Sequence, residues 1–466
     1  MDLSFLFDLT YLVSATLFVV GLKRLQSPAT ARQGNALAAL AMLVAIVATL
    51  VENDVLSWTG ILIGMTVGSL IGALAARMVK MTDMPQMVGI FNAFGGGASA
   101  LVAGAEFVRI QQMGAPMATS TGLSIGLGSL IGAVTFTGSF VAFGKLQGLI
   151  SGNPITFPLQ KTFNALLFLA ALALGAGLSG AFALGGLTPL TVFMVFIGIS
   201  LLLGALLVIP IGGADMPVVI SLLNSYSGLA AAAAGFVVGN MVLIISGALV
   251  GAAGLILTIA MCKAMNRSLA NVAFGTFGGE SATAQVASGD KPVRSIDAEQ
   301  AAMVLAYAQS VVVVPGYGLA VAQAQHELRK VMEILEERGV DVKYAIHPVA
   351  GRMPGHMNVL LAEADVPYDK LFDLDEINDD FQRTDVVLVV GANDVVNPES
   401  RSPQSVIAGM PILDVDRAKN CIIMKRSLSP GFAGIDNPLF YLDGTMMFFG
   451  DAKVSMSDLA REVREA

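Results

Sequence analysis

The sequence is poor in charged residues. Of its 466 residues only 13% are Asp, Glu, Lys or Arg, whereas a soluble globular domain carries about 25%. The shortage is confined to residues 1–268, which hold 10 basic and 7 acidic residues, against 17 and 28 in residues 269–466. One environment cannot suit both compositions, which excludes a wholly soluble enzyme, a disordered chain and a basic nucleic-acid-binding protein. We therefore expect a membrane domain followed by an acidic soluble domain, with no nucleic-acid partner.

Cysteine and histidine are also scarce. Cys262 and Cys421 fall in different halves of the chain, so no disulfide framework is predicted, and we predict no metal site. All three histidines lie after residue 268. A proton relay through the first half must then use Asp215, Glu106, water or a group on another chain, because imidazole is missing there. Interfacial placement is the simpler interpretation of Glu106.

Long apolar runs dominate the first half. A helix that spans a membrane needs about 20 mostly apolar residues, and nine stretches qualify: 3–22, 35–51, 56–76, 86–107, 122–144, 164–183, 189–210, 216–238 and 241–262. The first stretch has no basic leader and no small-residue cleavage site, so we expect it to be a retained span. With the N-terminus outside, nine of the ten basic residues in this half fall on the inner side, and only Arg109 is outside. An odd number of spans then places the second half in the cytoplasm.

Polar residues at membrane depth are candidates for a proton or ion path. Asp215 lies in a Gly- and Pro-containing break between two apolar runs, and Asn224 follows in the next run. Broken helix ends expose backbone groups that can line a polar cavity. Asn92 and Ser139 are further polar positions, which can orient water but cannot titrate. The alternative is that this set only makes hydrogen bonds between helices.

The second half alternates between β-rich runs and helical stretches. We predict a transmembrane domain over 1–265, a Gly- and Ser-rich linker over 266–293 and an α/β domain over 294–466. Strand candidates are 310–314, 342–346, 385–390, 421–424 and 446–449, with one helix expected over about 320–338. Such alternation predicts a Rossmann-like fold, with a parallel sheet covered by helices on both faces.

The turn after the first of these strands has a dinucleotide-binding pattern. Gly316 and Gly318 follow the strand and open a helix, as Gly-x-Gly-x-x-Gly/Ala requires, although Val321 replaces the third small residue. A glycine-rich turn without a nucleotide is the alternative. The next strand ends in His347-Pro348 rather than in the Asp or Glu that holds the ribose of NAD. Lys425-Arg426-Ser427, after a later strand, supplies two cations and a hydroxyl suited to a 2′-phosphate. The pattern therefore favours NADP over NAD, with a solvated basic patch as the alternative.

Three loops after strands add polar residues to this candidate site. Asp394, in Gly391-Ala-Asn393-Asp394, can bind a cofactor or cap a helix, and Arg352 can meet a phosphate or decorate a helix end. The Gly- and Pro-rich loop 429–438 suits a lid over a bound cofactor. The predicted cofactor-binding set is Gly316, Tyr317, Gly318, Val321, Arg352, Gly391, Asn393, Asp394, Lys425, Arg426 and Ser427.

Several long motifs resemble the β subunit of proton-translocating NAD(P) transhydrogenase. They include Gly212–Pro217, Leu223–Gly228, Met261–Arg267, Pro315–Gly318, His347–Arg352, Gly391–Asp394 and Lys425–Ser427. The resemblance implies reversible hydride transfer between NAD(H) and NADP(H), coupled to proton passage across a membrane. It implies NADP(H) on the cytoplasmic domain of this chain and NAD(H) on a partner α subunit, so that no residue of this chain alone is catalytic.

The same resemblance implies roles for particular residues. Gly316, Gly318 and Val321 would cradle the pyrophosphate, and the Lys425–Ser427 segment would hold the 2′-phosphate. Asp394 would lie near the nicotinamide, while Asp215, Asn224, Ser139 and Asn92 would belong to the proton pathway. Some family members carry His where this chain has Asn92, so the proton-binding group is expected on the partner subunit or in water and Asp215.

The resemblance further implies a bacterial inner membrane and a dimer of αβ assemblies. The rival hypothesis is an ion channel or secondary transporter that is regulated by a nucleotide-sensing Rossmann domain, which would share the same topology. A passive membrane anchor fails to explain the polar residues deep in the spans.

Overall fold

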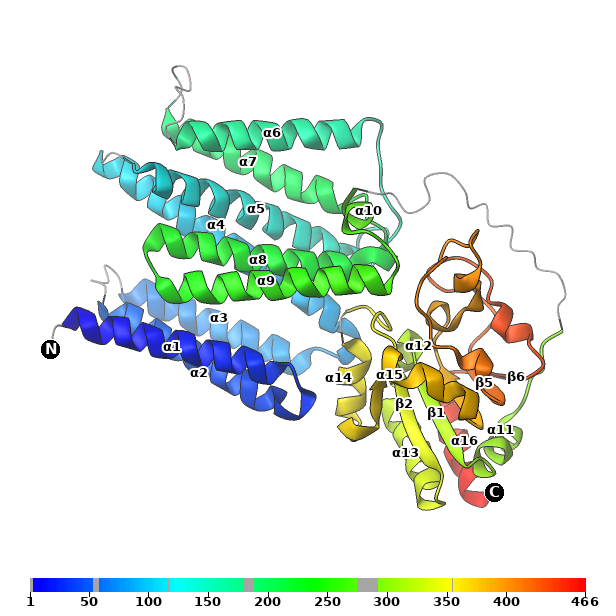
Figure 1. Ribbon diagram of the computed structural model, residues 1–466. Coiled ribbons are helices and arrows are strands. Elements are labelled where there is room, and N and C mark those ends of the chain that lie inside the picture. Colours follow the sequence, from blue (N-terminus) through cyan, green and yellow to red (C-terminus); the bar gives the residue numbers. More distant parts are fainter. Residues whose placement is uncertain are drawn as a thin grey trace. The chain divides into compact units, whose positions relative to one another are not determined.

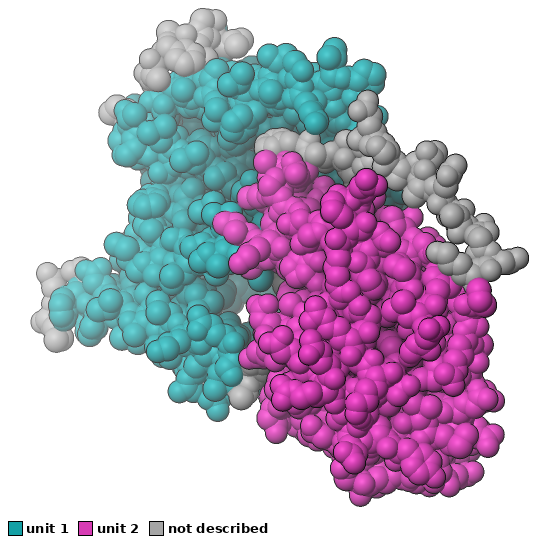
Figure 2. Space-filling view, turned by 45° about the vertical axis from the view of Figure 1, so that its right-hand side comes forward, with its two compact units in different colours: residues 1–213, 219–258 teal, residues 214–218, 259–466 magenta. Residues whose placement is uncertain are grey.

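The computed structural model describes residues 3–52, 58–114, 117–179, 186, 188–274, 292–353 and 355–466. The chain forms two compact units, coloured teal and magenta in Figure 2. Unit 1 comprises residues 1–213 and 219–258, and unit 2 comprises residues 214–218 and 259–466. Most of the linker predicted over 266–293 falls on residues 275–291, which lie outside the described residues, while the short helix α10 (Leu269–Phe274) occupies its first part. The predicted domain boundaries stay a prediction.

Within the described residues, nine helices are long and apolar enough to cross a membrane. They run side by side with their long axes roughly aligned (Figure 1). They are α1 (Leu3–Leu25), α2 (Pro28–Glu52), α3 (Trp58–Met78), α4 (Met84–Met113), α5 (Thr119–Leu146), α6 (Gln160–Leu178), α7 (Pro189–Val208), α8 (Met216–Val238) and α9 (Met241–Ala264). Each overlaps one of the nine predicted spans, which confirms the multi-pass helical domain.

Helices α8 and α9 pack backbone against backbone. A Cβ atom added at Gly228 would sit 2.5 Å from the Gly251 nitrogen, and one at Gly247 would sit 2.5 Å from the Ala232 nitrogen. Gly254 is similarly closed in by the backbone of Ser225, at 2.9 Å. Small residues permit this approach where lipid provides no hydrophobic drive for helices to associate. Ser225 Oγ donates to the Gly251 carbonyl at 2.5 Å and so adds a hydrogen bond between the two helices.

Unit 2 contains a six-stranded, fully parallel sheet in the order β3-β2-β1-β4-β5-β6. The strands are β1 (Ser310–Pro315), β2 (Asp341–Ile346), β3 (Leu371–Asp373), β4 (Val386–Val390), β5 (Asn420–Lys425) and β6 (Thr445–Phe449). This is the order of the dinucleotide-binding doubly wound fold, whose ligands bind at the carboxyl ends of the strands, where the strand order reverses. The reversal here falls between β1 and β4. The Rossmann-like prediction is therefore confirmed.

Alternate residues of the strands face the two sides of this sheet. Val312, Val387 and Ile423 belong to one buried cluster with Phe381 and Phe440, which lie in short 3₁₀ segments. The other layer contains α11 (Ala298–Ala306), α13 (Gln325–Glu337) and α16 (Ala452–Glu465), and α11 and α13 each pack against α16. The nearly continuous Val and Ile runs of β1, β4 and β5 reflect burial on both faces.

The helix expected over about 320–338 is instead two helices. Helix α12 (Tyr317–Ala322) ends at Gln323, whose φ of 51° is left-handed, and α13 begins at Gln325. A left-handed residue ends a helix because it turns the chain out of the helical path. The expectation of one continuous helix was wrong, although the helical start after Gly316 is present.

Candidate functional site

The predicted cofactor residues gather at the carboxyl edge of the sheet. In the strand register Pro315 pairs with Val390, and Val390 pairs with Met424. The turns that begin at Gly316, Gly391 and Lys425 therefore lie next to one another, although they are far apart in the sequence. This is the edge at which open α/β sheets bind their ligands.

The glycines of the first two turns touch through their backbones. The Gly318 N–H donates to the Gly391 carbonyl at 2.9 Å, and a Cβ on Gly318 would sit 2.8 Å from the Gly391 Cα. Gly391 has a φ of +68°, which glycine adopts without steric cost. Gly316 is equally enclosed by the backbone of Ala392. The result is a surface of bare backbone, which a pyrophosphate could approach closely.

Tyr317 connects two of the predicted loops. The Arg352 guanidinium lies over the Tyr317 ring at 4.5 Å from its centroid, and the Phe432 ring centroid is 6.1 Å from that of Tyr317. Arg352 comes from the loop after β2, and Phe432 comes from the predicted lid, residues 429–438. A cation over an aromatic face is favourable, so this cluster brings the Arg352 loop and the lid together over α12.

Asp394 is enclosed by the lid. Its Oδ2 accepts from the Ala433 N–H at 3.0 Å. Oδ1 is buried and has no hydrogen-bond partner among the described residues. Burial raises the pKa of this carboxyl, and the Ala433 N–H, the Lys425 ammonium and the Phe432 N–H oppose that rise. A buried acceptor that lacks a hydrogen-bond partner is energetically costly. Asp394 Oδ1 is therefore suited to accept a hydrogen bond from a bound ligand.

Lys425 is turned inward rather than toward solvent. Its Nζ donates to the Ser429 carbonyl at 2.8 Å and lies 4.6 Å from the centroid of the Phe440 ring. With the Asn393 amide in the orientation that satisfies its neighbours, Asn393 Oδ1 accepts from Lys425 Nζ at 3.0 Å and from the Gly431 N–H at 2.7 Å. Burial lowers the pKa of Lys425 to about 8, against the effect of Asp394 and Asp436. Lys425 thus holds the lid.

The remaining predicted cofactor residues are exposed. Arg426 has an exposed side chain and no ion pair among the described residues. Ser427 Oγ lies 2.9 Å from Ser429 Oγ, in a segment open to solvent. Val321 is 46% exposed on α12. Arg426 and Ser427 are therefore accessible to an external anion, whereas Lys425 is half-buried and holds the lid.

The sequence analysis assigned no structural role to three residues of this region. Asn437 is buried and donates through Nδ2 to the Asn393 carbonyl at 3.2 Å, and Asn397 Nδ2 donates to the Asp436 carbonyl at 3.1 Å. His347 Nε2 donates to the Pro411 carbonyl at 2.7 Å, while its Nδ1 accepts from the Val349 N–H. Both ring nitrogens are used by a neutral imidazole, and burial lowers its pKa to about 4. The position of Asn437 directly before Pro438, in the Gly- and Pro-rich loop, was the sequence feature that could have indicated a residue anchoring the lid.

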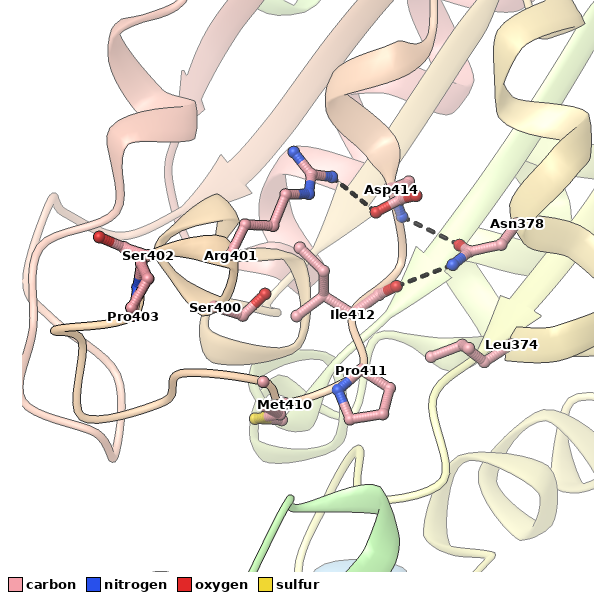
Figure 3. A pocket seen from close by; sticks show the side chains of 11 residues that line it. Leu374, Asn378, Ser400, Arg401, Ser402, Pro403, Met410, Pro411, Ile412 and Asp414 are labelled. Atoms are coloured by element: carbon pink, nitrogen blue, oxygen red, sulfur yellow. Dashed lines mark hydrogen bonds and ion pairs between the residues drawn. The ribbon is translucent and has the colours of Figure 1, made fainter.

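Unit 2 also has an open groove of about 500 Å³. Figure 3 shows Arg401 on its wall, pointing toward Asp414, and Asn378 bonded to the segment 412–414. Arg401 pairs at 2.6 Å with both Asp414 and Asp416, and these carboxylates raise its pKa. None of the predicted site residues lines the groove. Because two carboxylates satisfy its cation, the groove has no free charge with which to hold an anion.

Asp215 lies just before α8 and makes an ion pair. Arg267 Nη1 is 3.1 Å from both carboxylate oxygens of Asp215, whose side chain is only 2% exposed. Burial raises the pKa of Asp215 to about 6, and the Arg267 charge opposes the rise. A carboxyl that titrates near neutral pH can take up and release a proton under physiological conditions.

The other predicted pathway residues lie where α4, α5 and α8 meet. Asn92 Nδ2 donates to the Ile220 carbonyl of α8 at 3.2 Å, one turn before Asn224. Gly89, one turn before Asn92, faces the Ser139 backbone on α5. The Ser139 hydroxyl is fully buried and has no partner among the described residues. Asn92 and Ser139 are therefore buried polar groups on neighbouring helices, and Asn224 is half-buried on α8.

Two charged side chains of unit 1 have surroundings that the sequence did not specify. Glu106 is bound by two nitrogens of Arg109, at 2.6 and 2.7 Å. Lys145, which the sequence analysis counted only as an inner-side charge, is buried at 5% exposure.

Comparisons with known proteins agree on one family. A family model described as "NAD(P) transhydrogenase beta subunit" matches residues 7–462. The protein named "NAD(P) transhydrogenase subunit beta" of Rhodospirillum rubrum is 49% identical over 451 residues, covering 95% of this chain and 96% of that protein. The same name and identity are found for the protein of a defined strain of that species. The resemblance carried by the sequence motifs is thus confirmed.

Proposed function

We propose that the two parts of this chain carry out different steps of one coupled reaction. The chain belongs to the NAD(P) transhydrogenase beta subunit family. A beta subunit implies a partner alpha subunit, and the chain is one component of that enzyme. In our proposal its α/β domain binds NADP(H), and its helical domain conducts protons. The partner binds NAD(H), and hydride passes directly between the two nicotinamides.

The choice of NADP(H) rests on the distribution of charge at the carboxyl edge. An NAD site holds the ribose with an acid at the end of the second strand, but here that place belongs to His347, whose ring is buried and committed to Pro411. Arg426 and Ser427 instead offer an exposed guanidinium and hydroxyl to a 2′-phosphate. Gly316, Gly318 and Gly391 supply the backbone surface for the pyrophosphate. These residues fit NADP(H).

The remaining predicted residues would close over the ligand. Tyr317 and Arg352 form one wall, while Asn393 and Lys425 hold the lid in place. Asp394 Oδ1 would accept a hydrogen bond at the nicotinamide end, where the family resemblance places it. The bound cofactor supplies the hydride acceptor or donor. The protein has to orient it and expose one face to the partner's nicotinamide, because proximity is the main requirement of hydride transfer.

The proton pathway would use Asp215 together with Asn92, Asn224 and Ser139. Asp215 alone among these four residues titrates. Its ion pair with Arg267 provides two states, because a proton on Asp215 weakens the attraction to Arg267. We propose that proton occupancy changes the affinity or docking of the NADP(H) domain, and that bound nucleotide reciprocally changes proton affinity.

The decisive experiment reconstitutes this protein with its alpha subunit in liposomes. It follows hydride exchange between NADH and an NADP analogue together with internal pH. We expect coupled hydride exchange and proton movement, and we expect Asp215→Asn to abolish the inflection near pH 6 in the coupled rate. Ion flux without hydride exchange would indicate the rival channel or transporter with a nucleotide sensor.

The cofactor assignment has its own test. Arg426→Ala should weaken NADPH binding by about tenfold or more, because a hydrogen bond to a charged group contributes about 1.5–3 kcal/mol. NADH binding at the same site should not change. Arg383→Ala is a matched control, since Arg383 is an exposed arginine of the same unit, 83% accessible. An equal loss for both nucleotides would contradict a 2′-phosphate role.

We further propose a bacterial inner membrane as the location, with the N-terminus outside and the α/β domain in the cytoplasm. The supporting observation is the asymmetric distribution of Lys and Arg between the two sides. A dimer of αβ assemblies is part of the same proposal.

A further inference from the structure

Between the end of α7 at Val208 and the 3₁₀ turn Gly213–Asp215, residues 209–212 are not helical, and their carbonyls need partners from elsewhere. Leu206 accepts hydrogen bonds from Gln160 Nε2 at 3.2 Å and from Asn164 Nδ2 at 3.3 Å. Ile209 and Ile211 lie beyond the last helical residue, Val208. The last carbonyls of a helix have no partner within it, so polar groups that reach them determine where this end lies.

Lys145 reaches two of these carbonyls and a third from another loop. Its Nζ donates to the Ile209 carbonyl at 2.6 Å, to the Ile211 carbonyl at 2.7 Å and to the Asn153 carbonyl at 3.2 Å. An ammonium group has three N–H donors, and all three are used here. The side chain comes from the end of α5, so one residue joins three segments of the chain.

Backbone hydrogen bonds reinforce the same junction. The Ile155 N–H donates to the Ile209 carbonyl at 3.3 Å, and the Gly213 N–H donates to the Gly152 carbonyl at 2.8 Å. The loop after α5 is thus paired along the segment 209–213, and the Lys145 ammonium lies between them. Gly212 and Gly213 lack a Cβ, so their backbone angles are only weakly restricted. The position of this segment therefore depends on these external contacts.

We propose that Lys145 is a positioning residue for the proton pathway. Its ammonium fixes Ile211, four residues before Asp215 in the chain, and so fixes where the Asp215 backbone begins. The cluster of Asn153, Ile209 and Ile211 carbonyls is, in chemical terms, a site for a primary ammonium cation, which Lys145 fills. This inference rests on the proposed role of Asp215 in proton conduction.

A charged donor is required at this place. Three carbonyl dipoles converge on one point. A neutral apolar side chain would leave the buried Ile211 carbonyl without this partner, the Asn153 carbonyl without its donor, and the Ile209 carbonyl with only the Ile155 N–H, and a buried acceptor without a partner costs free energy. Arginine keeps the charge and the donors, whereas methionine keeps the length and loses both. The two substitutions therefore separate the ammonium from the bulk of the side chain.

The test uses the αβ holoenzyme with Lys145→Ala, and Lys161→Ala is the matched control. Lys161 is exposed and lies at the start of α6. We expect Lys145→Ala to lower the hydride transfer rate of the solubilised holoenzyme, and proton uptake in liposomes, by at least tenfold. Lys161→Ala should stay within twofold of the unsubstituted protein.

Chemical rescue separates positioning from folding. Methylammonium, which has three N–H donors, should restore the Lys145→Ala rate at least threefold in detergent, where no proton gradient can be dissipated. Tetramethylammonium has the same charge and no donor, and it should restore nothing. The melting temperature of the variant should remain within the range of the Lys161→Ala control. Equal effects of the two cations, or no loss of rate, would overturn the proposal.

Two further variants keep the test decisive. If Lys145→Ala does not assemble with the alpha subunit, Lys145→Arg and Lys145→Met replace it, and the arginine variant should be at least fivefold more active. Equal activity of these two variants would overturn the proposal. Asp215→Asn shows which idea has failed. If Asp215→Asn conducts protons normally, the proposed pathway itself is wrong. If Asp215→Asn is inactive and Lys145→Ala is active, only the inference on Lys145 is wrong.

Discussion

At the scale of single residues, Asp394 and Lys425 depend on each other through the lid. Lys425 donates to the Ser429 carbonyl, and Asp394 accepts from the Ala433 N–H. Each group is half-buried, and each opposes the pKa shift that burial causes in the other. Opposite charges that both lose solvent stabilise one another's ionised state. The closed lid and the two charges therefore form one coupled arrangement.

Asp394→Asn should weaken NADPH binding by about tenfold or more, because a charge-assisted hydrogen bond contributes about 1.5–3 kcal/mol. Removing the carboxylate should also lower the pKa of Lys425 further below about 8. Binding should then become weaker as the pH rises from 7 to 9. Fluorescence titration of NADPH at several pH values measures both effects. Asp443→Asn, at an exposed position, is the control, and identical behaviour of the two variants would contradict this prediction.

His347 should make unit 2 sensitive to acid. Its pKa is lowered to about 4 in the folded protein, whereas an unfolded chain has a His pKa of about 6.5. Between pH 6.5 and 4 the unfolded state binds more protons at this site, so the free energy of unfolding falls as the pH falls. His347→Gln should flatten this dependence, as measured by the melting temperature of the holoenzyme from pH 7 to 5. His326→Gln, at an exposed site, should leave the slope unchanged; a similar slope in both variants would refute the assignment.

Residue types in strand-end loops predicted which polar groups meet at the sheet edge, but not their direction. Lys425 and Arg426 are adjacent in sequence, yet one faces the lid and the other faces solvent. Lys145 illustrates the same limit. The count of basic residues on each side of the membrane includes a lysine near a helix end whether its ammonium is solvated or buried. Which carbonyls lie within reach is a tertiary property. The roles of the predicted site residues stay proposals until the experiments above are done.

At the scale of elements, the site depends on how closely β1 and β4 end beside each other. A Cβ added at Gly391 would lie 2.5 Å from the Gly318 Cα. Such a contact forces the two turns apart, and the left-handed backbone of Gly391 adds strain for any other residue. The two turns can therefore form a continuous backbone surface only with glycine at this position.

Gly391→Ala should destabilise unit 2 by about 2–4 kcal/mol, from overpacking and from the left-handed conformation together. It should also weaken NADPH binding. Gly444→Ala is the control, because its Cβ would make only an ordinary contact, at 3.5 Å from the Lys419 carbonyl. Thermal unfolding and NADPH titration of the two holoenzyme variants provide the comparison. A Gly391→Ala protein as stable as the control would contradict the close approach.

Hydrophobic runs predicted five of the six strands within a residue or two, because strands buried on both faces have a strong apolar signature. Strand β3 was missed, since its three residues at the edge of the sheet carry little of that signal. The break between α12 and α13 was missed as well. Gln323 is a good helix former, and only the geometry of the turn requires its left-handed backbone.

At the scale of the whole molecule, charge distribution and hydropathy were sufficient to separate a membrane part from an α/β part. Hydrocarbon and water impose opposite demands on composition over hundreds of residues. The extent of the linker does not follow from composition, because a six-residue helix is too short to show the helical repeat of apolar residues. Helix α10, within the predicted linker, is such a case.

The proposed orientation predicts the accessibility of two loops. Gln112→Cys, at the end of α4, should react with a membrane-impermeant thiol reagent in intact cells, whereas Gln147→Cys, after α5, should react only after lysis. Both positions are exposed, and the native Cys262 and Cys421 are buried. The unsubstituted protein corrects for any background reaction. The reverse pattern would show that the N-terminus lies on the cytoplasmic side.

The glycine contacts between α8 and α9 affect how mutational data on this protein should be interpreted. A scan of every position, scored on activity, should find Gly228, Gly247 and Gly254 as intolerant as Asp215. None of these glycines has a side chain that could titrate or hold a ligand, and their intolerance follows from the distance between two backbones. In this region, a position can be intolerant of substitution because the two helix backbones leave no room for a side chain, and not only because its residue takes part in the reaction. Only tests that score charge and proton movement separately from assembly will distinguish the two.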